Sequence, residues 1–289
     1  MLLALLSLTA LAQERHELPG DPHHQTDISA FTIDHKQWRV GLASLDYGLL
    51  ENTQIGTNTL MWAFGTNARA KVTAIETERL AFSFQASTVS IHQRWLDAIT
   101  QAASGDDERA SSAALRVTPM SWRGSWSISP KWSVHLGNTW VLGRISGELT
   151  GEQIAGLIGA VTGGSIDASI TDAMGASTMY TGAVGRFTLA QSNLAAEWRR
   201  NQRSSLIFQS NSSLWISGMV IGTVGTASES GEVAAGGAAT FEQVLETLPS
   251  AASLSWQWRF DTLHLRLGIP LNPVNPFSYT QAITLYWLL

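Results

Sequence analysis

The chain has 289 residues, a formal net charge of −5 and no cysteine, and 44% of its residues are hydrophobic. This length fits one large domain or two modest ones, and the hydrophobic content excludes a disordered polymer. Because the net charge is negative, the protein has no overall positive potential to attract nucleic acid. The lack of cysteine excludes disulfides and thiolate metal sites. Only 14% of the residues are charged, whereas Trp occurs 12 times. This combination suggests contact with lipid.

The first residues of the chain have the features of an export signal. Residues 1–12 form an apolar run that ends in Ala10, Leu11 and Ala12, the pattern that signal peptidase reads. We therefore expect a signal peptide over 1–12, export from the cytoplasm, and a flexible leader over 13–27. A buried hydrophobic end remains the alternative, because no basic residue precedes the run. No later stretch reaches the roughly 18 apolar residues of a membrane-spanning helix.

From residue 38 onward the hydrophobic residues recur with a period of two, which is typical of strands with one apolar and one polar face. In residues 253–260, for example, every second residue is apolar: Leu254, Trp256, Trp258 and Phe260. A turn at 261–262 leads into a second alternating run, 263–269, so the two runs are predicted to form an antiparallel hairpin. The same alternation recurs in residues 80–87, 120–126, 132–137 and 194–199.

The connections between these runs alternate between short and long. Short turns are predicted at 34–36 or 50–52, and at 77–78, 129–131, 191–193 and 261–262, whereas 93–112, 150–176 and 226–250 are long insertions. Short periplasmic turns and long external loops are typical of outer-membrane barrels. We therefore predict an all-β fold over 28–289: an antiparallel up-and-down transmembrane β-barrel of about 12–14 strands, including one near 28–33. Residues 199–214 are either one long strand or contain two turns, and a soluble secreted β-sandwich is the architectural alternative.

One hairpin has a familiar form. The segment 46–56, with the sequence DYGLLENTQIG, resembles the strand, tight turn and strand of bacterial outer-membrane barrels. The resemblance is to this class and to no characterised family. It implies a place in the outer membrane and insertion by the barrel-assembly machinery, for which alternating residues 283–289 would form the last lipid-facing strand. It implies no substrate.

Many tryptophans lie near the ends of the predicted strands, where an indole ring can sit in hydrocarbon with its N–H among the lipid headgroups. We predict a membrane-interface girdle of Trp38, Trp62, Trp122, Trp126, Trp132, Trp140, Trp215 and Trp287. The alternative is that these side chains pack in a soluble core.

The polar faces of the predicted strands are rich in basic residues. The predicted lumen residues are Arg69, Lys71, Arg123, Glu197, Arg199, Arg259 and Arg266. Acidic residues gather instead in the long insertions, as in 106–108. A basic lumen would favour anions, and the alternative is that these arginines brace the wall through salt bridges and close the lumen.

Two of the long insertions show helical spacing of apolar residues. These are Ile154, Leu157, Ile158 and Val161 in one, and Phe241, Val244, Leu245 and Leu248 in the other. Each segment is predicted either to fold inward as a constriction or to form a short helix that caps the external mouth.

No motif for catalysis or for a cofactor stands out. His16, His23 and His24 occur beside acidic residues in a leader with no fixed ligand geometry. Ser165 and Asp167 lie in a glycine-rich stretch without a nucleophile elbow. We therefore expect no enzyme and no cofactor. The hypothesis is a porin-like channel for small solutes, with small anions as possible cargo. The alternative is a plugged structural or surface-interaction barrel.

Overall fold

The computed structural model describes residues 28–77, 79–104, 113–162, 179–201, 203–225, 236–244, 251–260, 262–272 and 283–289. The predicted signal peptide and leader lie outside these residues. The elements are β1 (Trp38–Gly41), β2 (Leu45–Leu50), β3 (Thr53–Thr57), the 3-10 helix η3 (Leu60–Ala63), β4 (Gly65–Glu76), β5 (Leu80–Ile91), α2 (Gln93–Ser104), β6 (Ala114–Ser129), β7 (Trp132–Thr150), α3 (Gly151–Thr162), β8 (Met179–Asn201), β9 (Ser204–Gly225), β10 (Gly236–Val244), β11 (Ala251–Phe260), β12 (Leu263–Pro270) and β13 (Thr284–Leu288).

The strands form a single antiparallel sheet that closes on itself. β13 pairs with β1, and β9 pairs with β8 as well as with its neighbours on the other edge. β10 and β11 both pair with that other edge of β9, β10 along residues 215–223 and β11 along residues 204–211. Because β10 and β11 lie one after the other along the same edge of β9, they count as one strand of the ring. The described residues therefore form a 12-stranded barrel. This confirms the predicted barrel and excludes a β-sandwich, which would consist of two separate sheets.

Short turns join the strands at one end of the barrel, as predicted. They connect β2 to β3, β4 to β5, β6 to β7, β8 to β9 and β11 to β12. The prediction of a turn at 191–193 was wrong, because these residues lie inside β8. The open question about 199–214 is also answered: residues 199–201 end β8, the turn falls between Asn201 and Ser204, and residues 204–214 belong to β9. Following the rule for outer-membrane barrels, we assign the short-turn end to the periplasm.

Alternation sends apolar side chains outward and polar side chains inward along the lower half of the wall. In β11, Ser253, Ser255 and Gln257 are buried while Leu254 and Phe260 are exposed. Exposed large apolar side chains occur around the ring, among them Leu80, Phe84, Trp126, Ile128, Trp132, Leu136, Leu267 and Trp287. Soluble proteins rarely expose so much contiguous apolar surface, whereas a barrel in lipid requires it. Among the described helices, none has the length and hydropathy needed to cross a membrane.

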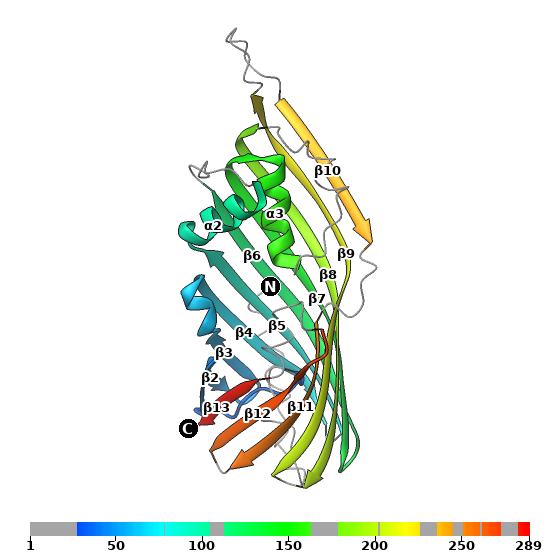
Figure 1. Cartoon of the computed structure of the whole chain (residues 1–289). Coiled ribbons are helices and arrows are strands. Elements are labelled where there is room, and N and C mark those ends of the chain that lie inside the picture. The colour runs from blue at the N-terminus through cyan, green and yellow to red at the C-terminus, as the bar shows by residue number, and fades with distance from the viewer. Residues whose placement is uncertain are drawn as a thin grey trace.

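The wall is tall on one side and low on the other (Figure 1). β8 has 23 residues and β9 has 22, whereas β1 has four. α2 and α3 lie against the inner face of the tall wall, near the external end (Figure 1). The predicted helical spacing at Ile154, Leu157 and Ile158 is confirmed by α3. The other predicted helical segment was wrong over 241–244, which is part of β10, and its remainder lies outside the described residues.

Residues 28–33 do not form the predicted first strand. They run as an irregular segment inside the barrel, and every one of them is buried. Their side chains pack in three places on the wall: Ile28 with Ala195 and Ile207, Phe31 with Ala81, and Ile33 with Tyr286 and Leu288. We call residues 28–33 the lumen segment.

Candidate functional site in the barrel lumen

The structure places the seven predicted lumen residues on the inner side of the lower wall. Lys71, Glu197, Arg199, Arg259 and Arg266 are buried, and Arg69 and Arg123 are half-buried. They come from β4, β6, β8, β11 and β12, so they surround the lumen from several sides. Arg69, Glu197, Arg199 and Arg259 take part in two ionic clusters, and Lys71 contacts the lumen segment. Arg266 bonds to Thr284, and Arg123 lines a cavity.

The first cluster centres on Asp46 of β2, which sequence reasoning missed. Its Oδ2 accepts hydrogen bonds from Arg39 Nε at 2.8 Å and Nη2 at 2.5 Å. Arg69 donates from Nε to Oδ1 at 2.8 Å and from Nη2 to Oδ2 at 2.7 Å. The side chain of Asp46 is 0% exposed and that of Arg39 is 1% exposed. One buried carboxylate therefore accepts hydrogen bonds from two guanidinium groups, one on β1 and one on β4, on either side of the β2–β3 hairpin.

Glycine makes room for this carboxylate. A Cβ at Gly56 of β3 would meet Asp46 Oδ1 at 2.0 Å and the Leu45 carbonyl oxygen at 2.5 Å. Any side chain at Gly56 would therefore displace Asp46 from its position between the two arginines. The signal was present in the sequence, because Asp46 and Gly56 both belong to the hairpin that resembles outer-membrane barrels.

The second cluster centres on Glu197 of β8. Arg259 Nη2 donates to Glu197 Oε1 at 2.6 Å, and Arg199 Nε lies 3.5 Å from Oε2. Arg199 also donates from Nη2 to Ser133 Oγ at 2.6 Å. The Glu197 side chain is 0% exposed. This cluster ties β7, β8 and β11 together along the inner face of the wall.

A polar and aromatic chain links further buried residues that the sequence did not single out. The Arg39 guanidinium lies over the Tyr286 ring at 5.5 Å, and that ring stacks on His264 with 4.8 Å between centroids. Arg266 of the same strand as His264 donates to Thr284 Oγ1 at 2.8 Å. These contacts join β1, β12 and β13 at the point where the barrel closes.

The lumen segment is held by hydrogen bonds to its backbone. Lys71 Nζ donates to the carbonyl oxygens of Ser29 at 2.8 Å and Phe31 at 2.6 Å. Thr73 Oγ1 donates to the Ala30 carbonyl at 2.9 Å, and the Ala30 N–H donates to Ser125 Oγ at 2.6 Å. The segment is thus anchored to β4 and β6. It occupies the lower lumen, and the wall satisfies these four buried backbone groups.

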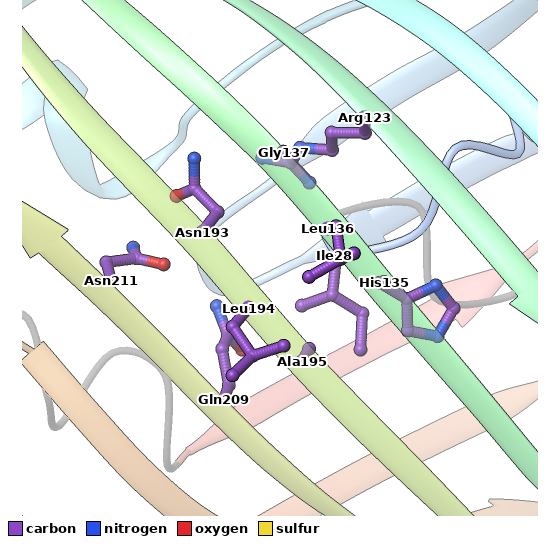
Figure 2. A pocket seen from close by; sticks show the side chains of 10 residues that line it. All are labelled: Ile28, Arg123, His135, Leu136, Gly137, Asn193, Leu194, Ala195, Gln209 and Asn211. Carbon is purple, nitrogen blue, oxygen red and sulfur yellow. The ribbon is translucent and has the colours of Figure 1, made fainter.

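Beside the lumen segment lies a small, partly open cavity of about 30 Å³. Figure 2 shows polar side chains from β6 to β9 around it, together with Ile28 of the lumen segment. The polar lining side chains are Arg123, His135, Asn193, Gln209 and Asn211. None of the described residues that line this cavity carries a carboxylate. A Cβ at Gly137 would meet the Trp122 carbonyl at 2.4 Å and Arg123 Cγ at 3.1 Å, so glycine is needed beside Arg123.

The upper lumen differs from the basic interior that the sequence suggested. Its wall presents buried apolar side chains, which pack with Leu96 of α2 and with α3. The wall residues of this cluster are Leu115, Val117, Val141, Ile145, Leu149, Phe187, Leu189, Ile216 and Val220. Because α3 buries Ile154, Leu157 and Ile158 against them, the helix lies inside the tall wall. The polar and basic part of the lumen is therefore confined to the periplasmic half.

The predicted tryptophan girdle faces outward in the main. Trp38, Trp62, Trp126, Trp132, Trp140 and Trp287 are between 39% and 56% exposed, whereas Trp122 and Trp215 are half-buried. Trp122 stacks on Phe82, and the Trp215 indole donates to Glu242 Oε1 at 2.8 Å. Whether these rings lie at the lipid headgroups remains a prediction.

The described residues show no group of three or more histidine, cysteine or acidic side chains that could hold a metal ion. His16, His23, His24, Ser165 and Asp167 lie outside them. The closed antiparallel barrel, with an apolar outer face and an ionic lower interior, defines the class: the chain is a β-barrel of the bacterial outer-membrane type.

Two solved structures are similar to this chain. Both are mutants of the TodX monoaromatic hydrocarbon channel, named deltaS2 and deltaS2S3. Each is 13% identical, and the match covers 90% of this chain and 68% of the other, with TM-scores of 0.37 and 0.36. No protein-family model and no curated relative matches the chain.

Proposed function

We propose that the protein is a porin-like channel for small solutes with a preference for anions, and that residues 28–33 close it in the conformation described. The observation that carries the proposal is the cavity beside the lumen segment. Among the described residues that line it, the charged group is Arg123, the other polar groups are amides and an imidazole, and none is a carboxylate. Such a lining attracts an anion by charge and by hydrogen-bond donation.

The charge of the whole described interior supports the same preference. The inward or buried basic residues are Arg39, Arg69, Lys71, Arg123, Arg199, Arg259 and Arg266. Against them stand the buried carboxylates Asp46 and Glu197 and the half-buried Glu76, which lies opposite the buried Ala81. The ion pairs compensate part of the positive charge locally. The remaining excess still raises the potential along the axis, because charges in a low-dielectric wall are poorly screened.

A 12-strand barrel has a wider interior than an eight-strand barrel, whose interior side chains just fill. Here the additional space of the lower half is taken by the lumen segment. The segment is held mainly by hydrogen bonds to its backbone, and Lys71 supplies two of them. Displacement of this segment would join the cavity to the periplasmic end. Insertion by the barrel-assembly machinery and export through the signal peptide complete the proposal.

The test is ion conductance of the purified protein in planar bilayers. The native barrel is expected to give brief openings with an anion-selective reversal potential in a KCl gradient. Arg123→Glu should make the reversal potential cation-selective. The matched control is Arg203→Glu, an equal charge change at an exposed turn, which should leave the selectivity anionic. Openings whose selectivity is the same in the native barrel and in Arg123→Glu would refute the anion site.

An engineered disulfide tests whether the lumen segment is the gate. Because the chain has no native cysteine, only the introduced pair can form a disulfide. Ala30 and Ala81 belong to the same buried cluster. The variant Ala30→Cys with Ala81→Cys should lose its openings on oxidation and regain them on reduction. Each single cysteine variant is the control and should not respond. A cross-linked barrel that conducts like the reduced one would show that the path bypasses the segment.

The second candidate is a plugged structural or surface-interaction barrel. The Glu197 cluster favours it, because a carboxylate bonded to Arg259 and paired with Arg199 braces the wall. This candidate predicts clean insertion into bilayers without conductance in the native barrel and in Lys71→Met, a variant that frees the segment. Conductance in either would exclude it.

A further inference from the structure

Three arginines form a row on the outer face of the tall wall. Arg116 of β6 lies directly opposite Arg144 of β7, and Arg144 lies directly opposite Arg186 of β8. All three are exposed. The alternation of buried and exposed positions places them on the lipid-facing side, because their neighbours Leu115, Ile145 and Phe187 are buried inside. We call these three residues the arginine row.

This arrangement is unfavourable for the isolated protein. Like charges at directly opposed positions of antiparallel strands repel each other and destabilise the sheet. No acidic side chain among the described residues forms an ion pair with Arg116, Arg144 or Arg186, since the ion pairs found involve other residues. Within the described residues, therefore, the positive charge of the arginine row has no compensating carboxylate.

On β6, β7 and β8 the arginine row marks a change in the outer surface, whereas β9 stays apolar, with Met219 opposite Arg186 and Ile221 beyond it. Outward along β7 from the periplasmic turn come Trp132, Leu136, Trp140 and Leu142, all exposed apolar residues, and then Arg144. On the neighbouring strands, Thr118 and Thr188 lie on either side of Leu142. An apolar surface thus gives way to hydroxyl groups and then to guanidinium groups.

The height of the arginine row above the periplasmic turns agrees with the height at which the apolar surface ends. Twelve residues separate Trp132, at the start of β7, from Arg144. At about 3.4 Å per residue and a strand tilt near 40°, Arg144 lies roughly 30 Å above the periplasmic turn. The apolar band of an outer-membrane barrel is about 25 Å tall. The arginine row therefore lies at the headgroups of the external leaflet.

We propose that the arginine row binds the phosphate groups of a phosphorylated lipid in the external leaflet. A guanidinium group offers paired N–H donors that match phosphate oxygens, and three of them on adjacent strands can serve more than one phosphate. Leu142, Trp140 and Met120 beneath the row would contact the acyl chains of the same lipid. This apolar contact selects a phosphate carried by a lipid over free phosphate. The site is independent of whether the lumen conducts.

The experiment measures binding of lipopolysaccharide, a phosphorylated glycolipid, to the purified barrel in detergent by quenching of tryptophan fluorescence. The test variant is Arg116→Gln, Arg144→Gln and Arg186→Gln together. The matched control is Lys131→Gln, Arg200→Gln and Arg203→Gln, which removes the same charge from exposed positions at the periplasmic end. We expect the Kd to rise at least tenfold in the test variant and to remain within twofold in the control.

Two further ligands identify the source of the phosphate. Dephosphorylated lipopolysaccharide should bind the native barrel as weakly as the native lipid binds the test variant. Inorganic phosphate at equal phosphate concentration should not displace the lipid. Three results would each overturn the proposal. The dephosphorylated lipid could bind the native barrel as tightly as the phosphorylated lipid does, inorganic phosphate could displace the lipid fully, or the control variant could lose as much affinity as the test variant. If the triple variant fails to fold, Arg144→Gln alone should raise the Kd at least threefold, and no change would again overturn it.

Discussion

Removal of the Asp46 carboxylate should strongly destabilise the barrel. Asp46→Ala deletes the acceptor of four hydrogen bonds and leaves Arg39, whose side chain is 1% exposed, and Arg69, at 16%, without their carboxylate. Breaking a buried ion pair by removing one partner costs about 3–5 kcal/mol, because a buried charge remains uncompensated. We expect the free energy of unfolding to fall by about that amount.

The assay is equilibrium unfolding of the barrel in lipid vesicles by guanidinium chloride, followed by tryptophan fluorescence. The denaturant midpoint should fall, and the slope should stay constant if the folded surface is unchanged. Glu51→Ala is the control, since Glu51 is exposed in the β2–β3 turn and its loss should cost within about 0.5 kcal/mol. Replacing Asp46 with Leu together with Arg39→Met and Arg69→Met should recover much of the loss. A loss below about 1 kcal/mol in Asp46→Ala would refute the view that this carboxylate compensates both arginines.

Three further experiments test other parts of the structure. Gly56→Ala should cost about 1–3 kcal/mol in the same unfolding assay, because its Cβ would meet Asp46 Oδ1 at 2.0 Å, whereas Gly124→Ala, with no atom within 4 Å, should cost little. Leu157→Asp places a charge where the side chain is 0% exposed. It should detach α3 and expose it to limited proteolysis, while Glu152→Gln should keep the native cleavage pattern. If the outward tryptophans form a girdle, lipids brominated near the headgroup should quench their fluorescence more than lipids brominated near the chain ends; the opposite order would contradict the girdle.

The sequence predicted the lower half of the barrel well because its strands obey a simple rule. Where a strand has lipid on one side and a polar lumen on the other, the residues alternate, as in β11 and β12. The rule fails in the upper half, where inward residues such as Val141 and Ile145 are also apolar because they pack against α2 and α3. Alternation disappears there, and periodicity alone cannot reveal that a helix fills the interior.

Polar residues inside strands caused the clearest error. Gln191 and Asn193 read as a turn, yet both lie in β8, where the pairing with β9 shifts register after Ala190. Gln191 Nε2 donates to Ser213 Oγ at 3.2 Å, and Asn193 Nδ2 donates to Thr139 Oγ1 at 3.0 Å. Neighbouring strands thus satisfy these polar groups. A single strand taken alone carries no signal of such partners.

The lumen segment and the ionic clusters escaped prediction for a related reason. Residues 28–33 contain spaced apolar residues and resemble a strand, but Lys71 and Thr73 take up their carbonyl groups in place of a neighbouring strand. The sequence places Arg199 and Arg259 correctly on polar faces, but their shared partner Glu197 is set by how the strands meet across the interior. Which cations become paired is a property of the closed barrel.

The closure itself has a kinetic consequence. β1 and β13 meet through three paired residues, from Arg39 opposite Leu288 to Gly41 opposite Tyr286. Joining two segments roughly 240 residues apart costs about 5 kcal/mol in chain entropy, apart from a constant. So short a ladder can offset that cost only once the other strands have already brought its ends together. Closure is therefore expected to be the last step of folding, and until then the growing sheet presents two open edges to any other strand nearby.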